Sequence, residues 1–187
     1  SMLVNPSDMK NHSETKRNIN NENIFDINRL GLSDSLETGK SVTVGLDYKK
    51  EKLEDINKYF EFKLATVFRD EEETFIPTTS TIGKKSSNLF GSITNNFSDK
   101  FNVGYNFALN NNLNTFDYNK INSVITLNNL VTEFSFIEEG GDIGSTNTFE
   151  NKSKYIFDEN NSISFKTRQN RKINLTEFYD LVYEYQN

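Results

Sequence analysis

Phe101–Asn110 reads F-N-V-G-Y-N-F-A-L-N, in which apolar residues alternate without a break with asparagine, glycine or alanine. A period of two places the five apolar side chains on one face of a β-strand and the small or amide groups on the other. Such a strand separates an apolar medium from a polar one. About ten residues at ~3.3 Å each, tilted by roughly 40°, span about 25 Å, the height of the apolar band of an outer-membrane barrel.

The same alternation recurs along the chain and predicts about nine strands. Short links such as Asn128-Asn129 alternate with long links such as Glu138–Lys152. This is expected of an antiparallel up-and-down meander with short turns at one end and long loops at the other. Lys50–Lys58 is the one helix-like stretch, and Asn5–Asn23 is expected to be a polar loop. The predicted strands are Ser41–Lys49, Tyr59–Arg69, Ser87–Phe97, Phe101–Asn110, Asn119–Asn128, Leu130–Ile137, Ser153–Phe157, Asn161–Arg168 and Leu175–Tyr185.

Composition argues against several functional classes. The 187-residue chain has a net charge of −6, which disfavours nucleic-acid binding, and its 13% aromatic content is too high for a disordered chain. It has no cysteine, and its single histidine is His12 in a polar stretch. A thiol nucleophile, a Ser–His pair and a Cys/His metal site are therefore not expected. We predict no enzyme activity, no catalytic, cofactor-binding or metal residues, and no cofactor.

Two environments fit the alternating pattern. One is a membrane barrel with its apolar face in lipid; the other is a soluble β-barrel or β-sandwich that binds a small apolar ligand or acts as a surface adhesin. The charged residues on the polar faces favour the membrane, because Glu61, Lys63 and Glu133 would be costly in the dry core of a soluble protein. We therefore predict an all-β segment of a transmembrane outer-membrane β-barrel, forming an open, curved sheet in isolation.

Three stretches carry a resemblance to one family. Asn23–Gly39 reads N-I-F-D-I-N-R-L-G-L-S-D-S-L-E-T-G and is followed by V-T-V-G-L-D-Y; Lys84–Phe107 contains S-N-L-F-G-S-I-T-N-N-F-S-D-K-F-N-V-G-Y-N-F; and a late segment, residues 161–185, contains K-T-R-Q-N-R-K-I-N-L. In order and spacing they resemble the LptD family (OstA, organic solvent tolerance), whose members assemble lipopolysaccharide (LPS) at the outer membrane. The first stretch resembles the family segment N-I-F-x-x-N-R-x-x-G-x-D-R-x-E-x-G.

The resemblance implies a piece of the family's C-terminal barrel, with residues 1–187 belonging to one barrel domain: a strand end and a long polar loop over 1–39, then strands and hairpin loops over 40–187. The implied function is LPS transport in the cell outer membrane, as barrel wall of the translocon that delivers LPS to the outer leaflet. Implied partners are LPS, an LptE-type lipoprotein plug and the periplasmic LPS-bridge protein. The family's N-terminal jellyroll and the closing seam of the barrel are expected to lie outside this segment.

Two long links contain candidate ligand-binding residues. Asp70–Glu73 reads D-E-E-E, and its carboxylates suit a divalent cation, although a solvated acidic loop explains the run equally. Gly140–Gly144 is glycine-rich, but a phosphate cradle would need a following helix N-terminus, so a flexible outer loop is the expected role.

Two sets of basic residues complete the candidates. Arg168, Arg171 and Lys172 could touch lipid phosphates or form a charged rim. Arg29 is expected to pair with Asp34 or Glu37 and so to pin a plug-like loop.

Overall fold

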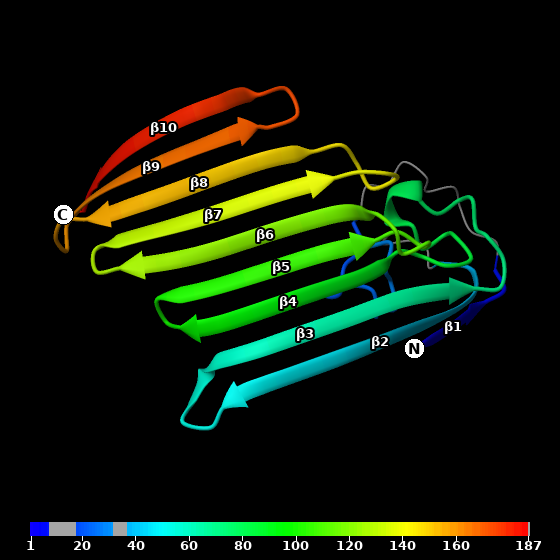
Figure 1. The fold of residues 1–187 in the computed structure, drawn as a ribbon. Coiled ribbons are helices and arrows are strands. Elements are labelled where there is room, and N and C mark those ends of the chain that lie inside the picture. Colours follow the sequence, from blue (N-terminus) through cyan, green and yellow to red (C-terminus); the bar gives the residue numbers. More distant parts are fainter. Residues whose placement is uncertain (8–17, 32–36, 187) are drawn as a thin grey trace.

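The computed structural model describes residues 1–7, 18–31 and 37–186, and in them one ten-stranded sheet follows the order of the chain (Figure 1). Every neighbouring pair of strands is antiparallel. The strands are β1 (Met2–Asn5), β2 (Gly39–Lys52), β3 (Asp55–Arg69), β4 (Leu89–Ser98), β5 (Phe101–Leu109), β6 (Phe116–Leu127), β7 (Leu130–Glu139), β8 (Asn147–Ile156), β9 (Asn161–Asn170) and β10 (Leu175–Tyr185). The first and last strands do not pair with each other, so the sheet is open.

The predicted all-β antiparallel meander is confirmed, with three differences. The strand predicted over Ser153–Phe157 begins at Asn147, inside the predicted link Glu138–Lys152, because pairing with β7 and β9 extends it through polar residues. A tenth strand, β1, pairs Met2–Asn5 with the start of β2; its three consecutive apolar residues, just before the polar stretch, show no alternation that would reveal it. Lys50–Lys58 is not helical, because β2 and β3 extend through it and meet in a tight turn. A single 3₁₀ turn covers Thr78–Ser80. The described residues contain no helix that is long and apolar enough to cross a membrane.

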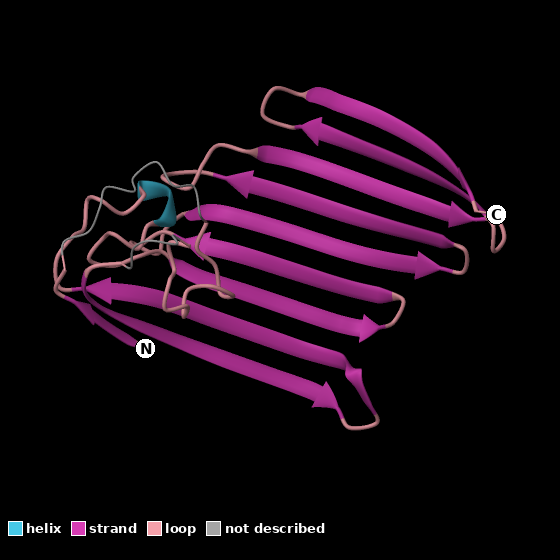
Figure 2. Ribbon diagram, turned by 180° about the vertical axis from the view of Figure 1, so that it is seen from behind, coloured by secondary structure: helices cyan, strands magenta, loops and turns pink. Residues whose placement is uncertain are grey.

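The connections differ at the two ends of the sheet. The links after β2, β4, β6 and β8 are tight turns at one end, whereas the long links gather at the other (Figure 2). Turn chemistry explains the short links: Asn128 adopts a positive φ of 50°, which asparagine tolerates well. In the β8–β9 turn the Asp158 carboxylate accepts hydrogen bonds from the Asn161 side chain and the Asn160 backbone, which lowers the pKa of that carboxyl.

The two faces of the sheet have opposite chemistry. One face, here called the outer face, carries exposed apolar side chains, such as Leu46 on β2 and Leu181 on β10, which are 57% and 68% exposed. Phe107 on β5 lies directly opposite Gly91 on β4, and an added Cβ at Gly91 would fall within 2.0 Å of the Phe107 ring. The glycine therefore makes room for the ring. The other face, the inner face, carries polar and charged residues and is partly covered by loops.

Phe107 and Asn106 are adjacent on β5 and point to opposite faces. The Phe107 ring stacks on Tyr105 at 5.4 Å and meets the edge of Phe116 at 5.8 Å. Asn106 instead lies opposite Ser92 of β4 and Lys120 of β6 on the inner face. If the outer face lies in lipid, Phe107→Arg should cost roughly 2–4 kcal/mol near the midplane, while Asn106→Arg should be nearly silent. Denaturant unfolding of both variants in lipid vesicles measures this difference. Equal damage from the two substitutions would contradict the assignment of the faces.

Candidate functional site

Two long links form a layer on the inner face at one end of β2–β5. This layer, residues 18–31 and 70–88, is called the cap. Its buried residues make a small hydrophobic core with residues of β3, β4 and β5, and burial of these aliphatic groups holds the loops against the strands. The cap contributes Ile19, Ile24, Leu30, Ile76 and Ile82, and the strands contribute Ala65, Val67, Phe90 and Ala108. The cap is therefore a packed structure with a core of its own.

The Phe25 ring of the cap contacts the sheet at a glycine, Gly45 of β2. An added Cβ at Gly45 of β2 would lie 2.5 Å from the Phe25 ring and 2.9 Å from the Leu64 carbonyl oxygen. Any larger residue at this position would push the ring away from the strand. Gly45 thus allows Phe25 to lie directly on the backbone of the sheet.

A buried carboxylate joins the cap to the sheet. Glu37, just before β2, accepts two hydrogen bonds from Arg29 of the cap: Nε to Oε2 at 2.9 Å and Nη2 to Oε1 at 2.6 Å. Arg69, at the end of β3, also donates from Nη2 to Glu37 Oε1. The three residues are 1–7% exposed. We call Arg29, Glu37 and Arg69 the charge cluster.

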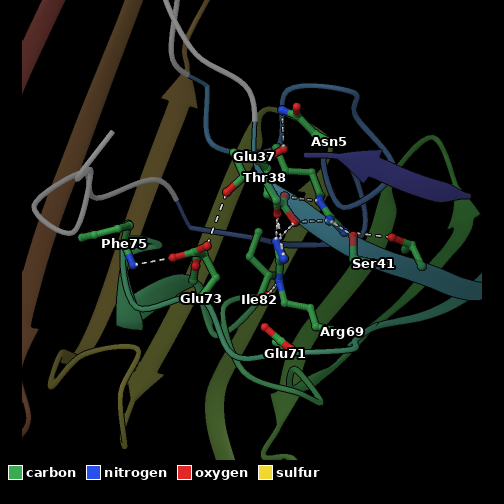
Figure 3. Close-up of polar contacts among 12 residues, drawn as sticks. Asn5, Glu37, Thr38, Ser41, Arg69, Glu71, Glu73, Phe75 and Ile82 are labelled. Carbon is green, nitrogen blue, oxygen red and sulfur yellow. Dashed lines mark hydrogen bonds and ion pairs between the residues drawn. The ribbon is translucent and has the colours of Figure 1, made fainter. Parts of the chain in front are cut away.

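Every guanidinium nitrogen of the two arginines has at least one hydrogen-bond partner. Arg29 donates to Thr43 Oγ1 and Ser41 Oγ of β2, both at 2.8 Å. Arg69 donates from Nε to the Ile82 carbonyl at 2.9 Å and from Nη1 to the Thr38 carbonyl at 3.0 Å (Figure 3). A buried charge is tolerated only with partners of this kind. The cluster therefore ties both cap segments to β2 and β3 at one point.

The predicted pairing of Arg29 with Glu37 is confirmed, and the alternative partner Asp34 lies outside the described residues. Arg69 was not foreseen as a member. It is 32 residues from Glu37 in sequence, and a strand-terminal arginine after an apolar stripe resembles an ordinary solvated end. The register of β2 against β3, which pairs Ser41 with Arg69, was needed to find it.

A cavity of about 640 Å³ lies beside the cap on the inner face. Its charged lining residues carry both signs, Glu22 and Glu61 against Lys63 and Lys120. Such a lining offers hydrogen-bond donors and acceptors to water or to a polar solute. Its asparagines come from the cap and from β4, β5 and β6: Asn18, Asn20, Asn21, Asn96, Asn102, Asn106 and Asn122.

Comparison with known families gives one match. The family model described as LPS transport system D, LptD, matches residues 7–136, more than half of the chain. The chain belongs to the LptD family. A search of curated proteins gives no match. The matched region includes the first two stretches on which the resemblance rested; the third, over residues 161–185, lies outside it and stays a prediction.

Membership of the LptD family gives the general setting. LptD proteins act in transport and assembly of LPS at the outer membrane and are not an enzyme family. In this LptD chain, the match includes the cap, the charge cluster and the strands β2–β6. The cap is therefore part of the region that the family model describes.

The acidic residues 70–73 of this LptD chain include members that pair or hydrogen-bond with neighbouring residues. Asp70 pairs with Lys40 at 3.5 Å, and Glu73 accepts hydrogen bonds from the Thr38 hydroxyl at 3.3 Å and the Phe75 backbone at 3.1 Å. Within the described part of the chain, no three acidic or histidine side chains come together as a metal-binding group. The contacts favour the solvated-loop interpretation over a cation site.

The glycine-rich loop packs against its neighbours. Gly140 donates its N–H to the Asp117 carbonyl at 2.8 Å, and Gly141 has a φ of +56° with the Asp117 carboxylate 2.8 Å from an added Cβ. Lys84 of the cap pairs with Asp142 at 2.5 Å. The loop therefore extends the cap toward β6 and β7, and no described helix follows it to hold a phosphate.

The three basic residues near the β9–β10 link do not converge. Arg168 on β9 pairs with Glu177 at 3.1 Å, and the Arg171 guanidinium lies 5.4 Å from the centre of the Phe136 ring. The Lys172 backbone N–H donates to the Asn170 side chain at 3.2 Å. Each residue has a separate partner, which favours a charged rim over a joint phosphate site.

Proposed function

We propose that this chain is a section of the wall of an outer-membrane β-barrel that delivers LPS to the outer leaflet. The observation that carries the proposal is the chemistry of the sheet's two faces. Val44, Leu46 and Tyr183 expose 52%, 57% and 60% of their surface on the outer face. Apolar exposure on this scale in water would promote aggregation, whereas lipid solvates it.

The inner face complements this assignment. Glu61, Lys63 and Lys166 lie on it with the asparagine-lined cavity, and a water-filled lumen keeps such groups hydrated. In this proposal, the saccharide of LPS moves along the inner face and its acyl chains stay with the lipid. A lipoprotein plug in the lumen and a periplasmic LPS-bridge protein are the proposed partners, reached through the whole parent protein.

The cap takes a structural role in this proposal. It covers the inner face of β2–β5 at one end and is fixed by the charge cluster. Residues 1–187 thereby act as scaffold: the strands form the wall, and the loops shape one mouth of the lumen. No catalytic step is assigned to any residue.

Depletion of the parent protein in cells tests the proposal. Surface-accessible LPS should fall and LPS should accumulate in the periplasm, with new sensitivity to detergents and hydrophobic antibiotics. A plasmid-borne copy should restore the surface LPS. Unchanged surface LPS after deletion of the parent gene would contradict the assignment.

Fractionation of the same cells separates this function from a soluble binding module or adhesin. A barrel section should remain in the outer-membrane fraction and require detergent for extraction. Recovery as a soluble monomer would support the module instead.

A further inference from the structure

One cross-strand pair breaks an otherwise regular pattern of charges. Wherever two charged residues lie directly opposite each other in the described sheet, they have opposite signs, except at Lys152 on β8 and Lys166 on β9. The opposite-sign pairs are Asp47–Lys63, Lys49–Glu61, Lys52–Asp55, Glu133–Lys152, Glu150–Arg168 and Lys166–Asp180. Like charges directly opposite each other destabilise a sheet, so an exception in mid-strand calls for a compensating partner.

The described chain offers only part of that compensation. The Lys166 ammonium lies 3.4 Å from Glu150 Oε1 and 5.5 Å from the centre of the Phe178 ring. The Lys152 side chain is exposed and forms no ion pair or hydrogen bond with a described residue, although Glu133 lies opposite it on β7. Its charge interacts with the Glu184 carboxylate of β10 only at longer range. One ammonium group therefore has no direct ion-pair partner, beside a second that is only loosely paired.

The position of the pair is accessible from the inner face. Glu150, two residues before Lys152, lies opposite Ser135, which lines the inner-face cavity, so Lys152 and Lys166 share that face. The cap core packs against β3, β4 and β5, and among the described residues none of β8 or β9 belongs to it. A solute on the inner face can reach both lysines.

We propose that Lys152 and Lys166 bind a phosphoryl group carried by a saccharide. An anion of roughly two charges between the ammonium groups would remove their repulsion and accept hydrogen bonds from both. Glu133 and Asp180 flank the pair in the same row across the sheet and accept hydrogen bonds from hydroxyl groups. The row thus matches a phosphate beside sugar hydroxyls, and its carboxylates disfavour a polyanion. The inference rests on the proposed function, in which the inner face contacts the saccharide of LPS.

Thermal unfolding of the full-length protein in a non-ionic detergent provides the test. The probes are glucose 6-phosphate, inorganic phosphate, glucose, and micelles containing phosphatidylglycerol. Glucose 6-phosphate should raise the midpoint Tm in a saturable way and more than inorganic phosphate, and glucose should have no effect. A larger shift from phosphatidylglycerol would assign the site to a lipid phosphate and overturn the saccharide proposal.

Three variants separate a binding role from a structural one. Lys152→Gln should weaken the binding of glucose 6-phosphate about tenfold, yet leave the ligand-free Tm unchanged or higher because the repulsion is relieved. Lys152→Arg should keep the response. Lys49→Gln is the control: Lys49 also lies on the inner face but pairs with Glu51 at 2.6 Å, so its loss should not change the response.

Two results would overturn the proposal. One is an equal response of Lys152→Gln and the unaltered protein; the other is a lower ligand-free Tm in Lys152→Gln, which would make Lys152 a structural residue. Failure of this site leaves the depletion phenotype intact. Failure of the proposed function would instead appear as unchanged surface LPS after depletion, whatever the phosphate response.

Discussion

Replacing Glu37 with alanine should release the cap from the sheet. The change leaves Arg29 and Arg69 buried without their shared carboxylate, and breaking a buried ion pair on one side costs roughly 3–5 kcal/mol. Arg29 belongs to the first cap segment, and Arg69 holds the second through the Ile82 carbonyl, so both segments should loosen together. Limited trypsin digestion in detergent, read by mass spectrometry, should then detect cleavage after Arg29 and Arg69, which are 2% and 7% exposed in the intact fold.

Glu71→Ala is the matched control for this experiment. Glu71 is an exposed carboxylate in the cap, and its only described hydrogen bond is through its backbone N–H, to Asp70. Its removal should leave the tryptic pattern and the surface LPS largely unchanged. Protection of Arg29 and Arg69 in Glu37→Ala would show that the hydrophobic core alone holds the cap.

Val103→Pro should abolish assembly of the parent protein. Val103 lies in the middle of β5, opposite Asn95 of β4 and Ser123 of β6, so proline removes a ladder donor between two paired strands. The cost is about 3 kcal/mol or more. In a strain depleted of the native copy, the variant should be missing from the outer-membrane fraction and should not restore surface LPS.

Asp99→Pro provides the comparison for Val103→Pro. Asp99 sits in the tight turn between β4 and β5, where proline is well tolerated and no ladder hydrogen bond is lost. It should assemble and transport like the unaltered protein. Normal assembly of Val103→Pro would be incompatible with β5 as an interior strand of the wall.

The strands were predictable from local pattern, because alternation and turn residues are properties of neighbouring positions. The strand predicted over Phe101–Asn110 ends one residue earlier, at Leu109, and the Asn128-Asn129 turn appears as the sequence indicated. Strand ends were less predictable: pairing extends β2 and β3 through Lys50–Lys58, whose charged residues favoured no strand by themselves. β1 was unpredictable for the same reason: it is pairing with β2 that makes Met2–Asn5 a strand.

The candidate site was predictable only where its members are close in sequence. Arg29 and Glu37 are eight residues apart, and their pairing was expected; Arg69 joins them through the fold. The Lys152–Lys166 pair was equally hidden, because a one-residue change of register would place each lysine opposite a different residue. The register of the strands decides which residues are buried together and which lie opposite each other. The sequence of one chain specifies that register only weakly.

The order of the strands has a consequence for how the chain folds. Each strand from β3 to β10 pairs with the strand just made, so a growing sheet can add one hairpin at a time with little loop-closure entropy. The β1–β2 junction differs, because the residues between Asn5 and Gly39 must be closed into a loop before the two strands meet. That loop includes Arg29 and Glu37, so β1 can dock at low entropic cost once these residues have met Arg69. We therefore expect the N-terminal strand to join the sheet last, after the cap has formed.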